Sequence, residues 1–441
     1  MLRRPRPLRS PPRTTRIRSR AVSSSPAPAQ SGAARLASRF AALRLHDLRF
    51  VFGATLVSGL GDGIVAVALA FAVLDLTHSA TDLGIVMAAK LVASITVTFI
   101  GGVVADRVSR RRVMIVADLV RLVSQGVIGT LLISGHATLL ELVISQVVLG
   151  AATSFFWPAS SGLVQAVSGD YVQEANALKV MASSGSGLLG PAIGGALVVG
   201  IGAPWAMVCD GASYLLSALL LTGVSVSALV SFERDREQRA SFLSEMRGGL
   251  REVTSRRWLS TEIVYMCLGN VLAASFPVLA PLICKQHYGG AAAYASLSVV
   301  FAAGMLVGGA TMLSFKPRHP LRAGALAYTP AMLPGVALGL HLPIYVVGAL
   351  QFVSGVGMTM SNTFLWTALQ EQIPAAAMSR VSSFEYGGSL SVTPIGYALA
   401  GPLAVALGSG PALIAMCAAA VLLNPLVLLV RDVRNLTRVA G

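Results

Sequence analysis

Two charged residues lie inside long apolar runs of this 441-residue chain, where an isolated charge is costly. Asp62 falls near the middle of the run over 50–74, and Lys90 lies in the next run, over 83–105. Because consecutive spans run antiparallel and rise about 1.5 Å per residue, the two side chains are expected to differ in depth by only about 6 Å. We predict an Asp62–Lys90 pair whose carboxylate gains and loses a proton as substrate disturbs it, which is what proton coupling needs.

Two other interpretations of this pair remain open, and a second pair lies nearby. Asp62 and Lys90 could form a static salt bridge between helices, or Lys90 could extend outward to the interface. Asp118 and Arg121 are three residues apart, so they share one face of a helix. For these two we expect a structural network with the loop at 101–112.

The composition is that of an integral membrane protein. Hydrophobic residues make up 54% of the chain and charged residues 12%, and the mean hydropathy is +0.71. A soluble chain carries about a quarter charged residues. Because lipid offers the backbone no hydrogen-bond partners, spans of this kind must be helical, and we predict an all-α membrane fold.

Several function classes are excluded by missing motifs. The four cysteines form no CxxC pair and the six histidines form no cluster, so we expect neither a metal nor a cofactor. There is no GxxxxGK[ST] loop for ATP, and no Ser-His-Asp or Cys-His constellation stands out in the polar segments. We therefore predict that the protein is not an enzyme and not an ATP-driven pump.

Runs of about 20 apolar residues predict twelve membrane spans. They are 50–74, 83–105, 112–134, 139–159, 177–200, 204–229, 259–283, 293–314, 322–341, 343–366, 383–407 and 411–430. Thirty of the 34 lysines and arginines fall on one side of this arrangement, together with both termini, and one falls on the other side. By the positive-inside rule, both termini are predicted to be cytoplasmic.

Five segments follow from this pattern. They are a disordered basic extension at 1–42, a six-helix bundle at 43–230, a cytoplasmic central loop at 231–257, a second six-helix bundle at 258–432, and a cytoplasmic tail at 433–441. Part of the central loop, 244–257, is predicted to be an amphipathic surface helix. The similar stretches 163–179 and 368–384 indicate that the two bundles are repeats.

The net charge of +15 does not indicate nucleic-acid binding. Residues 1–50 contain twelve arginines and one acid, so most of the excess lies in a Pro-, Ser- and Arg-rich head that cannot bury a core. This head is either a tail that contacts anionic lipid or an over-extended gene start.

A short charged loop joins the second and third predicted spans. Gly102 precedes Asp106 by one helical turn, and Arg107, Arg110 and Arg111 follow. The pattern resembles motif A of the major facilitator superfamily, with Ser109 in place of that motif's second glycine. The resemblance implies a gating role, in which Asp106 meets helix dipoles or an arginine of the other half. A plain topology anchor is the alternative.

The fifth span carries a second motif, GLLGPAIGG at 187–195. Its glycines are expected to allow close helix packing, and its proline removes a backbone donor and bends the helix. The stretch is similar to motif C of exporters in the same superfamily, with Ser186 where a glycine is expected; the residues concerned are Gly187, Gly190, Pro191, Gly194 and Gly195. Together with 58–69 and 117–123, it most resembles the enterobactin-exporter and macrolide-efflux branch.

The acids of the spans are distributed unequally. Asp210 is expected to cap or hydrate the outer end of its span, and Glu262 to be solvated at a span end. The second half offers aromatic and amide side chains in its spans, which we take as candidates for the substrate cavity: Asn270, Phe276, Tyr328, Gln351, Phe352, Asn362 and Trp366. Packing or interface anchoring is the alternative for the aromatic residues.

These features predict a major facilitator fold of two pseudo-symmetric six-helix bundles that works by alternating access. The predicted function is proton-coupled export of a hydrophobic or amphipathic small molecule across the cell membrane by a monomer. Siderophore or lysophospholipid export is one alternative, and a non-transporting sensor or assembly factor on the same fold is another.

Overall fold

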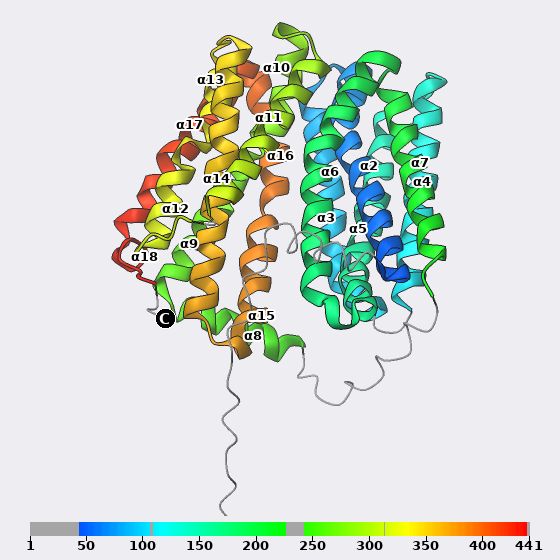
Figure 1. Cartoon of the computed structure of the whole chain (residues 1–441). Helices are drawn as coiled ribbons and strands as arrows, with labels where there is room; N and C mark the ends of the chain where they lie inside the picture. The colour runs from blue at the N-terminus through cyan, green and yellow to red at the C-terminus, as the bar shows by residue number, and fades with distance from the viewer. Residues whose placement is uncertain (1–43, 106–108, 226–241, 313, 439–441) are drawn as a thin grey trace, which may run out of the picture.

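The protein is described by a computed structural model that covers residues 44–105, 109–225, 242–312 and 314–438. Helices dominate these ranges, and no strand occurs in them (Figure 1). The first half consists of α2 (His46–Thr77), α3 (Ala80–Ala105), α4 (Arg110–Ile133), α5 (Leu139–Val167), α6 (Val172–Ile201) and α7 (Ala203–Thr222). The predicted head at 1–42 lies outside the described residues.

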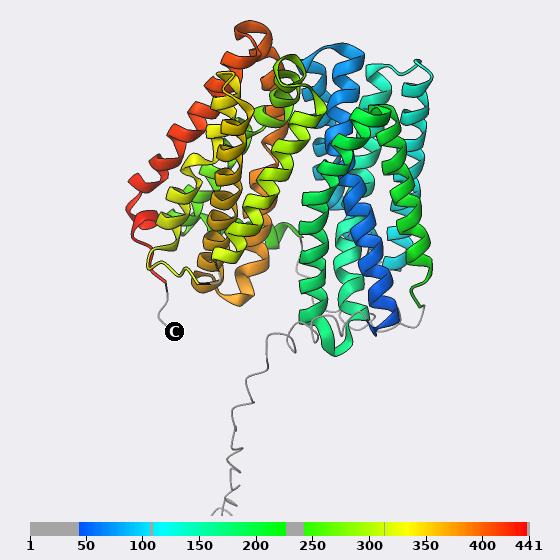
Figure 2. The same cartoon turned by 45° about the horizontal axis from the view of Figure 1, so that its top comes forward.

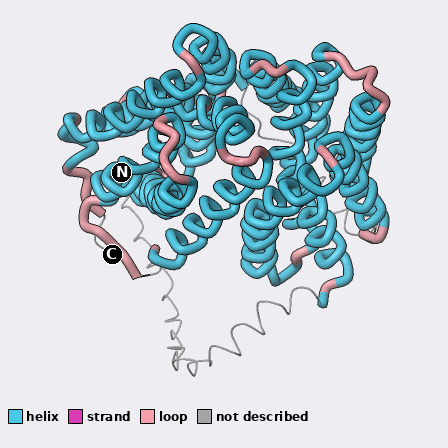
Figure 3. The backbone as a smooth tube through the Cα atoms, turned by 90° about the horizontal axis from the view of Figure 1, so that it is seen from above, coloured by secondary structure: helices cyan, strands magenta, loops and turns pink. Residues whose placement is uncertain are grey.

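The second half contains more, and shorter, helices. They are α8 (Phe242–Thr254), α9 (Arg257–Ala273), α10 (Ser275–His287), α11 (Ala291–Thr311), α12 (Pro320–Tyr328), α13 (Leu333–Gly339), α14 (Ile344–Gln372), α15 (Ala375–Ser382), α16 (Thr393–Leu407), α17 (Ser409–Leu426) and α18 (Arg431–Arg434). Viewed along the helix axes, the helices of the two halves form two groups side by side (Figure 3). This is the all-α arrangement that the apolar runs predicted.

Ten helical segments of the described chain are long and apolar enough to cross a membrane, counting α9 and α10 as one. Two of the twelve predicted spans are interrupted and do not reach this length. The span at 322–341 is broken between α12 and α13 by a 3₁₀ turn over Thr329–Met332 that contains Pro330. The span at 383–407 begins with a π-helical turn over Ser383–Gly388, and its apolar part, α16, has only 15 residues. Proline cannot donate the backbone hydrogen bond of a regular helix, which accounts for the first break.

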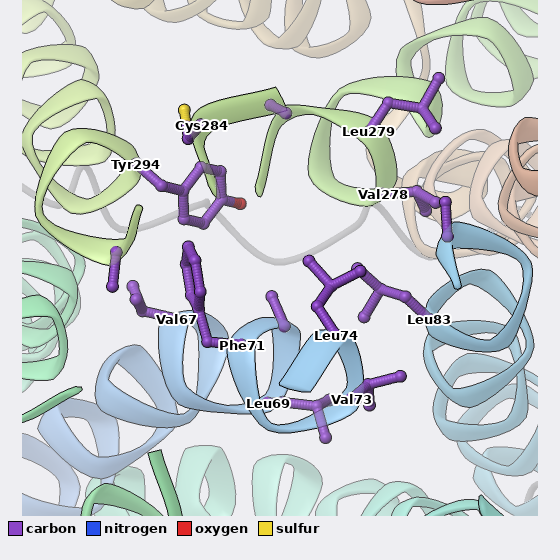
Figure 4. Packing of buried hydrophobic residues seen from close by; sticks show 14 of the residues in the cluster. Val67, Leu69, Phe71, Val73, Leu74, Leu83, Val278, Leu279, Cys284 and Tyr294 are labelled. Atoms are coloured by element: carbon purple, nitrogen blue, oxygen red, sulfur yellow. The ribbon is translucent and has the colours of Figure 1, made fainter. Parts of the chain in front are cut away.

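The two halves share one hydrophobic core at the end where α2 finishes and α3 begins, which we call the joined end. Phe71 and Leu74 of α2 face Val278 of α10 and Tyr294 of α11 in this core (Figure 4). The rings of Phe71 and Tyr294 lie 6.3 Å apart. At the rim, Lys285 of α10 forms an ion pair with Asp75 of α2.

Close contact at the joined end depends on glycine. A Cβ on Gly84 of α3 would lie 2.2 Å from the carbonyl oxygen of Tyr397 in α16, and a Cβ on Gly401 of α16 would lie 2.2 Å from the Cα of Thr81. Both distances are far below van der Waals contact, so no larger residue fits while α3 and α16 cross as they do.

At the opposite end, which we call the split end, each half has a core of its own. One cluster contains only first-half residues such as Met114 and Leu163, and another contains only second-half residues such as Leu259 and Leu369. The start of α2 and the last described helix, α18, lie at this end (Figures 1 and 2). The protein is therefore sealed between its halves at the joined end.

Candidate functional site: a buried charge network in the first half

A buried ion pair on α4 forms the centre of the candidate site. Arg121 and Asp118 are both 0% exposed, and Arg121 Nη1 lies 3.4 Å from Asp118 Oδ1. The guanidinium carbon also lies 4.4 Å from the ring centre of Phe156 on α5 and 5.2 Å from that of Tyr214 on α7. A desolvated cation over aromatic faces is stabilised by their quadrupoles, so these two rings favour a guanidinium at this position.

Hydrogen bonds extend this pair to the neighbouring helices. Ser217 of α7 donates to Asp118 Oδ2 at 2.6 Å, and Ser58 of α2 lies 3.5 Å from Arg121 Nη1. In the same way, Tyr214 donates to Asp62 Oδ1 at 2.8 Å. Asp62 is thus connected to the central pair through Tyr214, whose ring lies beside Arg121.

A second buried carboxylate completes the network. Asp210 of α7 is 0% exposed and accepts a hydrogen bond of 2.6 Å from Gln125 of α4. Gly61 of α2 allows this approach, because a Cβ there would lie 2.4 Å from Asp210 Oδ1. The prediction that Asp210 caps or hydrates a helix end is wrong: it lies two turns inside α7, on the face that packs against α2 and α4.

The predicted direct contact between Asp62 and Lys90 is not formed in this structure. Both residues are described and half-buried, yet their charged atoms do not come within 4.0 Å of each other. Lys90 lies where α3 packs on α5, since a Cβ on Gly150 would lie 2.1 Å from its carbonyl oxygen. Asp62 is satisfied by Tyr214 instead. Both charges still act electrostatically on Asp210, so they border the same network.

Asp118 and Arg121 contact α2, α5 and α7. Residues 106–108 of the loop expected to meet them lie outside the described residues. Three polar members of the network, Gln125, Tyr214 and Ser217, were not singled out from the sequence. A signal for them exists, because Asp118, Arg121 and Gln125 recur every three or four residues, as do Asp210, Tyr214 and Ser217.

The network carries more negative than positive groups and is incompletely paired. It has three carboxylates, those of Asp62, Asp118 and Asp210, and two basic groups, Arg121 and, at the border, Lys90. Within the described chain, Arg121 Nε and Nη2, Gln125 Oε1 and Asp210 Oδ1 have no hydrogen-bond partner. Buried polar atoms are rarely left so in a purely structural core. A site of this kind can take up a proton on one carboxylate and release it when the helices move.

Two arginines of the basic loop fasten helix ends at the split end. Arg110 donates to the carbonyl of Gly162 in α5 at 2.7 Å, and Arg111 donates to those of Leu221 and Thr222 in α7 at 2.9 and 2.6 Å. Leu221 and Thr222 are the last residues of α7, and the last carbonyls of a helix have no partner within it and attract cations, whereas Gly162 lies inside α5. Of the other predicted gating residues, Gly102 lies within α3, and Asp106 and Arg107 lie outside the described residues.

We expect Arg111→Ala to lower the apparent melting temperature of the detergent-purified protein by a few degrees. The substitution removes the side-chain donor to both carbonyls. The Leu221 carbonyl keeps a backbone donor, the N–H of Val224, so the loss of about 1–2 kcal/mol comes mainly from Thr222. Arg112→Ala is the matched control, because Arg112 is exposed and its side chain makes no contact of this kind. Equal melting temperatures for the two variants would contradict the assigned role of Arg111.

The predicted motif at 187–195 allows α6 to pack closely on α2 and, across the contact between the two halves, on α11. Gly190 and Gly194 face α2: a Cβ on Gly190 would lie 2.7 Å from the Cα of Gly63, and one on Gly194 would lie 2.8 Å from the carbonyl oxygen of Ile64. Gly195 faces Ala295 of α11, in the other half. Gly187 has open space where its Cβ would be, and Pro191 lies within the helix.

Three of the predicted substrate residues line one cavity of about 100 Å³ in the second half. They are Asn270 of α9, Tyr328 of α12 and Asn362 of α14. The structure does not bring the other four to this cavity. Phe276 packs against the shared core and Trp366 against the core of the second half, Gln351 is buried on α14, and the carbonyl of Phe352 contacts α11 at Gly304.

The sequence profile of the Major Facilitator Superfamily matches residues 51–389. The chain belongs to this superfamily. It is therefore a multi-pass membrane transporter, as the resemblance of its two motifs implied.

Two curated relatives are exporters. The chain is 26% identical over 377 residues to the enterobactin exporter EntS of Shigella boydii serotype 18 and to that of Escherichia coli O127:H6, which covers 82% of this chain and 86% of each relative. The superfamily fold is also seen in solved structures. The nucleoside transporter NupG aligns with a TM-score of 0.71 at 11% identity, covering 87% of this chain and 98% of that one. A bacterial homologue of the lysosomal transporter Spinster, in an inward-facing conformation, aligns with a TM-score of 0.60 at 16% identity, covering 90% and 95%.

Proposed function

We propose that this superfamily member is a proton-coupled exporter of a hydrophobic or amphipathic small molecule across the cell membrane. The observation that supports this most is the network around Arg121, in which three carboxylates from α2, α4 and α7 surround one guanidinium. An excess of buried negative charge is costly unless protons or cations enter. Protons are the ions that such carboxylates exchange without a built coordination shell.

Alternating access follows from the two ends of the molecule. The halves are sealed at the joined end and have separate cores at the split end. The basic loops lie at the split end, so by the positive-inside rule this end and both termini are cytoplasmic. In this interpretation the halves share a core at the outer end and have separate cores at the cytoplasmic end, the arrangement expected of the state in which an exporter takes up its substrate.

Asp62 is the coupling residue in this proposal. It is half-buried, whereas Asp118 and Asp210 are fully buried, so Asp62 is the most accessible carboxylate of the three. Its hydrogen bond to Tyr214 carries the change in charge to the ring beside Arg121. Motion of α2 against α7 would then follow protonation.

A second candidate substrate class is a siderophore, because the relatives named above are enterobactin exporters. The sequence identity of 26% supports common ancestry with them and leaves the substrate open. A lysophospholipid translocator and a non-transporting sensor have no observation in their favour. A sensor would also leave the buried network without a use.

We expect Asp62→Asn to abolish proton coupling while the protein still inserts. The assay uses everted vesicles with an imposed pH gradient, which acridine orange reports. Ethidium, erythromycin or enterobactin is added, and the gradient should dissipate through the protein only if the protein transports the added compound. The native protein should respond to at least one, and the response identifies the substrate class. Asp82→Asn is the control, because Asp82 lies at the start of α3, away from the network. Normal dissipation by Asp62→Asn would remove the coupling assignment.

A further inference from the structure

The cavity of the second half contains a carboxylate that the proposed mechanism does not use. Glu262 lies in the second turn of α9 and is 8% exposed, and its side chain lines the cavity of about 100 Å³. The expectation that Glu262 is solvated at a span end is therefore wrong. Helix α9 begins at Arg257, but the Glu262 side chain is turned toward α12 and α14 instead of the aqueous end.

Glu262 has no partner in the described chain. No lysine, arginine or histidine of the described residues lies within 4.0 Å of its carboxylate, and no described donor forms a hydrogen bond to it. Neighbouring polar groups are already engaged: Tyr265 donates to Asn424, and Asn424 donates to Thr329 Oγ1 at 2.8 Å. A buried ionised carboxylate is retained only when something compensates its charge.

The first half shows what compensates an equivalent position. Its network lies between the first, third, fourth and sixth helices of the bundle, and there Arg121 supplies the positive charge. The cavity around Glu262 is bordered by α9, α12, α14 and the end of α17, the corresponding helices of the second half. In the described part of this half, no buried cationic side chain occupies the corresponding place.

We propose that the cavity of the second half binds the cationic head group of the transported molecule, with Glu262 as its counter-ion. The rings of Tyr265 and Tyr328 border the same space, and aromatic faces favour substituted ammonium groups. The amides of Asn270 and Asn362 offer oxygen acceptors to any N–H of the ligand. A volume of about 100 Å³ admits several waters or a small head group, and the apolar remainder of a ligand would extend outside it.

This inference narrows the proposed substrate class to amphipathic organic cations. It rests on the proposed function in one respect, namely that the molecule in the cavity is the one transported. Binding itself needs no gradient. The test therefore uses purified full-length protein in detergent, with binding of ethidium, a permanent cation, followed by fluorescence anisotropy. We expect Glu262→Gln to weaken ethidium binding at least about tenfold, because the ligand's charge would then be desolvated without a counter-ion.

Matched variants separate this effect from general damage. Glu141→Gln replaces a glutamate at the start of α5, outside the cavity, and should bind ethidium as the native protein does. Glu262→Asp keeps the charge and should retain most of the affinity, which also keeps the test decisive if Glu262→Gln folds poorly. Binding is measured here without a gradient, whereas the vesicle assay reports proton movement, so failure of the coupling proposal and failure of this one give different results.

Three outcomes would overturn the inference. The first is that Glu262→Gln binds ethidium as tightly as the native protein does, and the second is that the native protein does not bind ethidium. The third is that NaCl displaces ethidium but the same concentration of tetraethylammonium chloride does not. The third would identify a metal-cation site instead. Displacement by tetraethylammonium, and not by the neutral ring compound phenanthridine, would support an organic-cation site.

Discussion

Replacing Arg121 by methionine should give the largest loss of stability of any single substitution in the first half. Methionine fills a similar volume but leaves Asp118 buried, with Ser217 as its one remaining hydrogen-bond partner among the described residues. Breaking a buried pair by removing one partner costs about 3–5 kcal/mol. We expect a much lower melting temperature in detergent, poor accumulation in the membrane and no substrate-dependent proton movement.

The double variant Asp118→Asn/Arg121→Met tests the reason for this loss. It removes both charges together, so it should recover a substantial part of the melting temperature that Arg121→Met loses. Transport should stay absent, because Asp62 and Tyr214 would no longer lie beside a cation. If Arg121→Met alone were as stable as the native protein, Asp118 and Arg121 would not form a buried ion pair in solution.

Replacing Gly401 by valine should shift the protein away from the conformation described here. The Cβ alone would lie 2.2 Å from the Cα of Thr81, a backbone atom that cannot turn aside. Overpacking costs about 1–3 kcal/mol, which corresponds to a change of roughly five- to 150-fold in the ratio of two states. In the proposed alternating-access cycle the joined end separates in the alternate state, so that state would not suffer the clash.

Spin labels at Val172 and Thr311 would measure this shift. These residues lie at the split ends of α6 and α11, one in each half, so their separation should shorten as the split end closes. Gly348→Val is the matched control, since a Cβ at Gly348 meets nothing within 4 Å. An unchanged distance distribution in Gly401→Val would mean that α3 and α16 do not separate during transport.

Much of the fold follows from the sequence alone. Apolar length located the spans, because the hydrocarbon core requires about 20 residues of helix, and the arginine-rich loops marked one side of the membrane. The resemblance of 101–112 and 187–195 to known motifs indicated the superfamily, which the profile match confirms. Interrupted spans were not foreseen, because hydropathy averages over the turns at Thr329–Met332 and Ser383–Gly388.

The candidate site shows where this reasoning ends. Sequence position gives the depth of a side chain along its helix, and by depth alone Asp62 and Lys90 belonged together. It does not give the rotation of the helix about its axis, which depends on how all neighbours pack. In the packed bundle Asp62 faces Tyr214, and the backbone of α3 at Lys90 lies against α5.

The same limit explains the two misjudged acids. The sequence determined that this chain is a helical membrane transporter with charges buried in its spans. Only the tertiary structure decided that Asp210 and Glu262 are enclosed, because enclosure depends on the helices that surround each side chain and not on its distance from a span end. Which carboxylate meets a cation, and which is left to bind one, is a property of the packed bundle.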